Sequence, residues 1–227
     1  MPISELPGLV CEDISNGQEN FRIPATNLVD NSPIPPSVTF IVCGWLGPGG
    51  VLEVFKTKSK GWGVRTWDSI LPGALICEYT GVLRRTTEVE GLLENNYIFD
   101  IDCLQTMEGL DGREQRAGSE LHMASLHSEH DSEVASRTPE YCIDAGSVGN
   151  IARFINHSCQ PNLFIQCVLS SHRDIKLAKV MLFAADTRFR SSRTTTGIGW
   201  TVSLGQMAIF VKLACHCGAS DCRKRLY

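Results

Sequence analysis

Four cysteines have the residue type and spacing to hold a metal ion. Cys215, Cys217 and Cys222 form a C-x-C-x4-C group close to the C-terminal end, and Cys159 lies mid-chain, after the run Asn-His-Ser. Four soft thiolate ligands are the number that a closed, tetrahedral zinc site takes. The spacing therefore predicts one zinc ion shared by two distant stretches, which pins the tail onto the middle of the fold.

Two further groups have residue types that suit a bound cofactor. Residues 60–65 read Lys-Gly-Trp-Gly-Val-Arg, and glycine permits both close approach of the main chain to a ligand and the unusual dihedral angles of such a turn. Asn156 offers both a donor and an acceptor, which suits a purine edge, and His157 follows it. Each feature also has an ordinary interpretation. A Gly-Trp-Gly run is more often a hairpin turn with a buried indole, and an isolated histidine is more often a structural residue.

The run 153–159, Arg-Phe-Ile-Asn-His-Ser-Cys, resembles the signature of the SET-domain protein lysine methyltransferases, and the tail cysteines resemble their post-SET segment. Residues 11–15 and 23–30 resemble the start of the pre-SET region in the plant suppressor-of-variegation class. The resemblance covers residues 52–186 and 213–227. It implies methyl transfer from S-adenosylmethionine to a histone tail peptide, most often at lysine nine of histone H3, in nuclear, repressed chromatin.

The resemblance also implies roles for individual side chains. Tyr79 and Tyr97 stand where related enzymes place tyrosines of a lysine channel or cofactor contact, so we expect them to be catalytic; their rings exclude water and their hydroxyls orient the amine. The reaction needs a neutral amine held in line with the methyl group, without a covalent enzyme nucleophile. An isolated tyrosine is more often a core residue with a satisfied hydroxyl. The implied cofactor-binding residues are Lys60, Gly61, Trp62, Tyr97, Arg153, Phe154, Asn156 and His157.

Two features suggest where a peptide would bind. Residues 142–144, Cys-Ile-Asp, resemble the strand beside which the substrate pairs through main-chain hydrogen bonds, and an ordinary buried strand is the equal alternative. Glu94, Asp100 and Asp102 are expected to give a local field that attracts a basic peptide, or else a solvated face without a partner.

The chain departs from the family pattern after residue 186. The family continues with E-L-T-Y-D-Y-G-Y or a close relative, whereas residues 187–200 contain no tyrosine. Codons for T-Y-D-Y-G-Y, read one base further along, encode R-T-T-T-G-I, the sequence of residues 193–198. We hypothesise a local reading-frame shift within residues 187–210, which sequencing of the transcript tests. Loss of this motif is expected to open the lysine channel and to lower the rate by orders of magnitude.

A second departure lies near the start of the chain. The pre-SET region of the class normally carries nine cysteines around three zinc ions, whereas only Cys11 and Cys43 precede residue 51 here. That cluster cannot form in this chain. The missing tyrosine segment favours the alternative to an active methyltransferase, which is a SET-domain remnant that binds cofactor or histone peptide without turnover. A zinc-stapled structural element with another task is a third hypothesis.

The composition sets limits on partners. The chain has 227 residues, 43% of them hydrophobic, enough for one globular domain of about 150 residues with attached segments. A formal charge of −4 offers no footprint for phosphate backbones, so no direct DNA binding is expected. No apolar run reaches the roughly 20 residues that span a bilayer and no secretory signal is evident, so we expect a soluble, intracellular protein without a membrane partner. In a reducing compartment the ten cysteines favour metal chemistry over disulfides.

The elements that would position these residues are mostly strands. We expect a mainly β, SET-domain fold of several small sheets, with a knot-like crossing implied by the resemblance. Alternating and β-branched runs predict strands at residues 51–55, 61–65, 74–79, 97–102, 141–144, 163–169 and 175–185, and a short helix within 86–95. The expected organisation is an irregular pre-SET remnant at 1–50, a SET domain at 51–210 with a flexible insertion at 107–138 and an anomalous segment at 187–210, and a post-SET zinc tail at 211–227.

Overall fold

In a computed structural model of the chain, the described residues are 2–35, 39–41, 52–68, 70–89, 97–101, 139–169, 178–185, 198–199, 201–202, 215–220 and 222–224. The insertion expected at 107–138 lies outside them, as do Cys43, Glu94, Asp102 and most of the anomalous segment. Within the described part, no helix is both long and apolar enough to cross a membrane.

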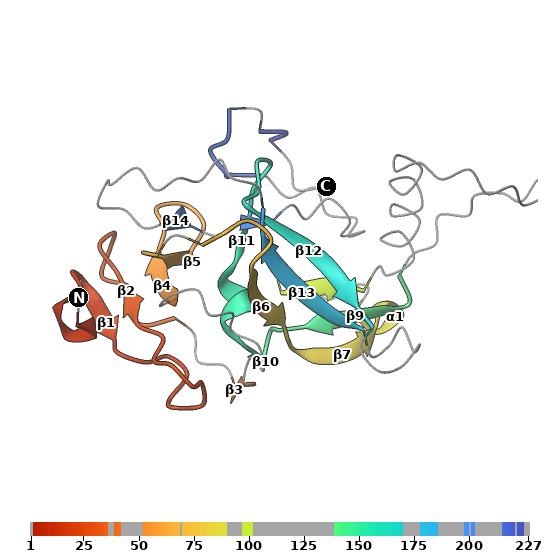
Figure 1. Ribbon diagram of the computed structural model, residues 1–227, viewed down its shortest axis with the longest axis horizontal. Coiled ribbons are helices and arrows are strands. Elements are labelled where there is room, and N and C mark those ends of the chain that lie inside the picture. Colours follow the sequence, from red (N-terminus) through yellow and green to blue (C-terminus); the bar gives the residue numbers. More distant parts are fainter. Residues whose placement is uncertain are drawn as a thin grey trace, which may run out of the picture.

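The largest sheet has five strands in the order β1-β2-β4-β5-β14 (Figure 1). Its centre is the antiparallel pair of β4 and β5, with Leu52 opposite Thr66 and Lys56 opposite Trp62. β1 and β2 lie in the stretch predicted to be irregular, because strands of two or three residues are too short to show a period in the sequence. The strands are β1 (Leu9–Cys11), β2 (Ala25–Thr26), β4 (Leu52–Lys56), β5 (Trp62–Thr66) and β14 (Ile198–Gly199).

Two three-stranded antiparallel sheets complete the body of the fold, in the orders β12-β13-β6 and β7-β9-β8. Their strands are β6 (Leu75–Tyr79), β7 (Val82–Arg85), β8 (Ile98–Asp100), β9 (Tyr141–Asp144), β12 (Leu163–Val168) and β13 (Lys179–Ala184). The helices are short: η1 (Ile3–Glu5), α1 (Thr86–Val89) and η2 (Ile151–Phe154). The prediction of a mainly β fold with small sheets is confirmed.

Two small parallel pairs join segments that are far apart in the sequence. β3 (Thr39–Phe40) pairs with β10 (Val148–Gly149), and β11 (Asn156–His157) pairs with β15 (Thr201–Val202). The second pair brings the late segment back beside the Asn-His run, as the expected crossing requires.

The main core lies between the five-stranded sheet and β6, β12 and β13, and it encloses η2. All four residues of η2 are buried. Asn150 caps this helix by accepting from the main-chain N of Ala152 at 3.0 Å, and its amide donates to the Glu78 carbonyl of β6 at 2.7 Å. The helix is thereby fixed against β6, and the Asn-His strand β11 leaves it at a defined place.

Candidate active site and metal centre

The four cysteines that were predicted to share a metal ion lie close together in the structure. The Sγ atoms of Cys159, Cys215, Cys217 and Cys222 all lie within 4.8 Å of one another. The separation between Cys159 Sγ and Cys215 Sγ is 3.9 Å, and four sulfurs about 2.3 Å from a tetrahedral zinc lie about 3.8 Å apart. The all-thiolate set and this spacing fit a metal ion such as zinc.

The surroundings of the thiols differ in a way that favours metal binding at two of them. Hydrogen bonding from the main-chain N–H of Cys159 lowers the pKa of Cys217 to about 6. The pKa of Cys159 is itself lowered, chiefly by the main-chain N–H of Arg223, whose nitrogen lies 3.5 Å from the sulfur. Burial raises the pKa of Cys215 to about 12, so a metal ion is needed to hold this thiol as a thiolate.

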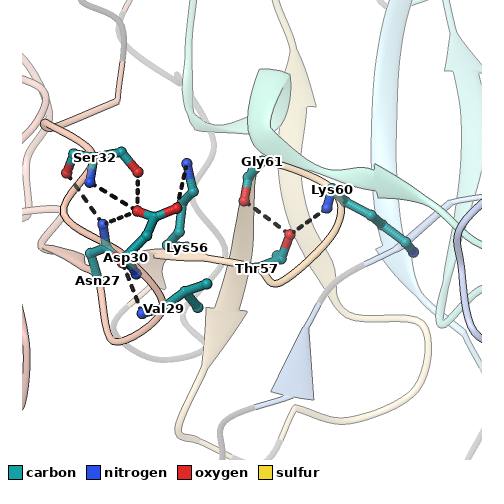
Figure 2. A network of polar contacts seen from close by, with 8 residues as sticks. All are labelled: Asn27, Val29, Asp30, Ser32, Lys56, Thr57, Lys60 and Gly61. Atoms are coloured by element: carbon teal, nitrogen blue, oxygen red, sulfur yellow. Dashed lines mark hydrogen bonds and ion pairs between the residues drawn. The ribbon is translucent and has the colours of Figure 1, made fainter.

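The glycine-rich turn between β4 and β5 has a fixed conformation. The Thr57 hydroxyl donates to the Gly61 carbonyl at 2.9 Å and accepts from the main-chain N–H of Lys60 at 2.8 Å (Figure 2). The main-chain N–H of Thr57 donates to the same carbonyl at 2.8 Å. Gly61 has a φ of +66°, a left-handed conformation that other residues rarely adopt. The predicted turn is therefore present, and Gly61 is required by its backbone.

Two hydrogen bonds join this turn to β11. Lys60 Nζ donates to the His157 carbonyl at 3.0 Å, and Asn156 Nδ2 donates to the Trp62 carbonyl at 2.8 Å. The contact is close: a Cβ added to Gly63 would lie 3.2 Å from Asn156 Nδ2. The sequence thus selected residues that the fold does bring together across more than 90 positions of the chain.

His157 lies between this turn and the cysteine cluster. Its Nε2 is 3.5 Å from Cys159 Sγ, and the side chain is buried. Burial, followed by the positive charges of Arg223 and Lys60, lowers the pKa of His157, so the imidazole is neutral at pH 7. The cysteine cluster is therefore in direct contact with β11.

Arg153 and the two candidate tyrosines form a second group. The guanidinium carbon of Arg153 lies 4.1 Å from the Tyr97 ring centroid, and Nε donates to the Ala145 carbonyl at 3.0 Å. Nη2 donates to the Gly146 carbonyl at 3.3 Å, whereas Nη1 is buried and has no hydrogen-bond partner among the described residues. A buried donor of this kind is costly unless an acceptor meets it.

Tyr79 lies beside Tyr97, the other candidate catalytic tyrosine. Its hydroxyl has a hydrogen-bond partner, as expected for a core residue. Its hydroxyl donates to the Tyr97 carbonyl at 2.8 Å, and its ring centroid is 5.4 Å from that of Phe99. Burial raises the pKa of Tyr79, so the phenol stays protonated. Phe154, by contrast, is a buried core residue whose ring lies 5.0 Å from the Arg153 guanidinium.

The structure decides one of the two predictions about peptide binding. The strand of residues 142–144 belongs to β9, the central strand of its sheet, with Cys142 opposite both Arg84 and Asp100. Because both edges of β9 are already paired, a substrate peptide has no free main-chain edge there, and the ordinary buried strand is the correct interpretation. Asp100 is 8% exposed, whereas Glu94 and Asp102 lie outside the described residues, so the expected attraction of a basic peptide by these three acids stays a prediction.

Two residues that shape the site were not predicted from the sequence. Asn150 caps η2, and an Asn directly before a run of helical residues is the usual signal of such a cap. Lys56 places its Nζ 5.4 Å from the Trp62 ring centroid, which follows from the cross-strand register and has no signal in the local sequence.

Comparison with known proteins shows which family the chain resembles. The profile of the SET domain matches residues 61–186. The H3 lysine-9 specific histone-lysine N-methyltransferase SUVH4 of Arabidopsis thaliana is 39% identical over 300 residues, covering 99% of this chain and 48% of SUVH4. SUVH6 of the same plant is 38% identical over 182 residues, covering 78% of this chain and 22% of SUVH6. An alignment of 300 residues exceeds the 227 of this chain, so SUVH4 carries segments without a counterpart here.

Solved structures agree with these matches. KRYPTONITE in complex with mCHH DNA, an H3 peptide and SAH has a TM-score of 0.65 at 35% identity, covering 98% of this chain and 55% of that one. Arabidopsis SUVH6 in complex with SAM has a TM-score of 0.70 at 28% identity, covering 99% of this chain and 58% of that one. The chain spans about half the length of SUVH4 and of these solved chains. Since KRYPTONITE was crystallised with DNA, our expectation of no direct DNA binding stays a prediction. The chain belongs to the SET-domain family, and its sequence is similar to the plant histone-lysine N-methyltransferases SUVH4 and SUVH6.

Proposed function

We propose that this chain transfers a methyl group from S-adenosylmethionine to lysine nine of the histone H3 tail, in nuclear chromatin. The observation that carries the proposal is the pair of hydrogen bonds that joins the Gly-Trp-Gly turn to the Asn-His strand, within a chain of the SET-domain family. SUVH4 and SUVH6 are both H3 lysine-9 specific, which supports the choice of substrate.

Unsatisfied and closely packed groups support the cofactor assignment. The buried Nη1 of Arg153 lacks an acceptor among the described residues, and S-adenosylmethionine carries a carboxylate of the matching charge. The tight contact at Gly63 excludes larger residues from the turn that we propose lies against the cofactor. Lys60, Gly61, Trp62, Asn156 and His157 are the other residues proposed to hold it. When bound, this cofactor supplies the methyl group on a sulfonium.

We propose that the tyrosines favour the neutral form of the substrate lysine amine. A lysine ammonium taken from water into an aromatic environment loses solvation, which lowers its pKa and favours the neutral, nucleophilic form. Tyr79 stays protonated, so its hydroxyl keeps donating to the Tyr97 carbonyl and holds this tyrosine in place. The cysteine cluster and its zinc would act structurally, by fixing the tail beside β11.

A transfer assay with radiolabelled S-adenosylmethionine tests the proposal. The substrates are an H3 tail peptide and a matched peptide with arginine in place of lysine nine. Label is expected on the first peptide and not on the second. Cofactor binding without labelling of the lysine peptide would contradict the proposed activity, and equal labelling of both peptides would contradict the proposed site.

A matched pair of variants tests the site. Lys60→Ala removes the hydrogen bond to the His157 carbonyl, whereas Lys58→Ala removes an exposed ammonium from the same turn. The first is expected to weaken cofactor binding by up to about 10- to 150-fold, since a hydrogen bond from a charged group contributes about 1.5–3 kcal/mol. The second is expected to leave binding unchanged. Equal effects of the two substitutions would mean that the turn acts only through its net charge.

A further inference from the structure

A short loop of the N-terminal segment is held in a fixed shape by its own side chains. Asn27 Oδ1 accepts from the main-chain N of Val29 at 3.0 Å and of Asp30 at 3.2 Å, and Asn27 Nδ2 donates to Asp30 Oδ1 at 3.0 Å. Ser32 donates to the same carboxylate oxygen through its main-chain N–H, at 2.9 Å, and through its hydroxyl. Figure 2 shows this loop beside the glycine-rich turn. The orientation of Asp30 is therefore set by the loop.

The second oxygen of Asp30 faces Lys56. The separation between Asp30 Oδ2 and Lys56 Nζ is 3.7 Å, and the lysine side chain is only 17% exposed. Strand pairing explains the meeting: β2 runs parallel to β4, with Thr26 opposite Phe55, so the loop that follows β2 reaches the end of β4, where Lys56 lies. A lysine side chain with so little exposure is stabilised by an anionic partner of its ammonium.

Lys56 in turn lies over the indole of Trp62. The two residues are opposite each other in the β4–β5 pair, and Nζ is 5.4 Å from the ring centroid, within the range of a cation–π contact. Asn156 holds the main-chain carbonyl of the same tryptophan. Trp62 is thus fixed on its main-chain side by β11 and on its ring side by Lys56.

We propose that Lys56, oriented by Asp30, is a positioning residue for Trp62, and that the N-terminal segment thereby sets the shape of the cofactor site. The proposal rests on the proposed function, because Trp62 belongs to the residues assigned to S-adenosylmethionine. Asp30 and Lys56 both lie outside residues 61–186, which match the SET domain. The loop of residues 27–32 therefore acts on the site from outside the matched domain.

Cofactor binding by four single variants tests this role. Calorimetry with S-adenosylhomocysteine measures the dissociation constant for the whole chain and for Lys56→Met, Lys56→Arg, Asp30→Asn and the exposed control Lys58→Met. Lys56→Met keeps the length of the side chain and removes the charge, and it is expected to weaken binding about three- to thirtyfold, the range that a cation–π contact supports. Lys56→Arg is expected to restore binding to within about twofold, since a guanidinium also stacks on indole. Lys58→Met is expected to bind like the unaltered chain.

The pair of Asp30 and Lys56 should also behave as one unit. Asp30→Asn is expected to weaken binding in the same direction, and the double variant is expected to bind no more weakly than Lys56→Met alone. Additive losses would show that Asp30 acts independently of Lys56 and would overturn that part of the proposal. Lys56→Met binding as tightly as Lys58→Met would overturn the role of Lys56.

A spectroscopic readout separates this inference from the proposed function. The emission of Trp62 is obtained without cofactor, as the difference between each chain and the same chain with Trp62→Phe. This difference spectrum is expected to change in Lys56→Met and Asp30→Asn, and to be restored in Lys56→Arg. A chain that fails to bind cofactor but shows this pattern would contradict the proposed function and leave Lys56 as the positioning residue. An unchanged difference spectrum in Lys56→Met would overturn the inference whatever the cofactor does.

Discussion

Replacing Cys159 by serine is the sharpest test of the shared metal centre, because the other three cysteines of the cluster all belong to the tail. Cys159 Sγ lies 3.9 Å from Cys215 Sγ, close to the tetrahedral spacing. Structural zinc sites bind with about 10–16 kcal/mol, so an equal share for each of four ligands is about 2.5–4 kcal/mol. At about 1.4 kcal/mol for each factor of ten, Cys159→Ser is expected to weaken zinc binding about 10²- to 10³-fold.

Competition with a chromophoric chelator measures this affinity, and atomic spectroscopy of the purified chain measures the zinc content. We expect one zinc per chain before the substitution and a loss of zinc after dialysis against the chelator in the variant. The control is Cys11→Ser, which removes a half-buried thiol from β1, outside the cysteine cluster. This control is expected to keep both the zinc and its affinity.

Loss of the metal is also expected to affect the cofactor site. Loss of the metal frees the tail, so cleavage of residues 215–224 by a protease is expected to increase. Because Cys159 Sγ lies 3.5 Å from His157 Nε2, cofactor binding is also expected to weaken. An unaltered zinc affinity in Cys159→Ser would refute the shared centre. Loss of zinc from Cys11→Ser to the same extent would show that the effect comes from general destabilisation.

Three further substitutions or treatments have defined outcomes. Glu53 is fully buried and accepts from Arg65 Nη2 at 2.7 Å, so Glu53→Gln is expected to lower the free energy of unfolding by about 3 kcal/mol. The control Glu12→Gln, in an exposed pair with Arg22, is expected to lower it by less than about 1 kcal/mol. Equal midpoints of urea unfolding for the two variants would contradict this. Gly63→Ala crowds Asn156, so it is expected to lower the free energy of unfolding by about 1–3 kcal/mol and to weaken cofactor binding. The control Gly73→Ala, at a φ of +76° with open space around it, is expected to lower stability and to leave cofactor binding intact. Calorimetry measures the binding of both variants. In the metal-free chain, pH 7 is above the lowered pKa of Cys217, about 6, so this cysteine is mostly a thiolate, whereas Cys215, with a pKa raised to about 12, is a thiol. Peptide mapping after iodoacetamide treatment is expected to find Cys217 modified before Cys215. Modification of Cys215 before Cys217 would contradict the assignment.

The sequence by itself determined the candidate ligand groups and the local elements. Four cysteines in two groups carried the metal prediction, because thiolates are characteristic ligands whose spacing survives in the primary sequence. The Gly-Trp-Gly turn followed from the need for glycine at a left-handed position, which Gly61 occupies. Strands such as β12 and β13 showed their apolar, β-branched composition, so their existence was predictable.

The tertiary structure alone decided which strands are neighbours and therefore which edges are free. β9 looked equally suitable as a peptide-binding edge and as a buried strand, and its position between β7 and β8 settled the question. Likewise, no local pattern linked Asp30 to Lys56 or to Trp62, because their contact depends on the parallel pairing of β2 with β4 and on the register of β4 with β5. Turn conformations are fixed by short-range sterics, whereas strand pairing depends on burial throughout the chain. This is why candidate site residues could be selected from the sequence, whereas the contacts that support them could not.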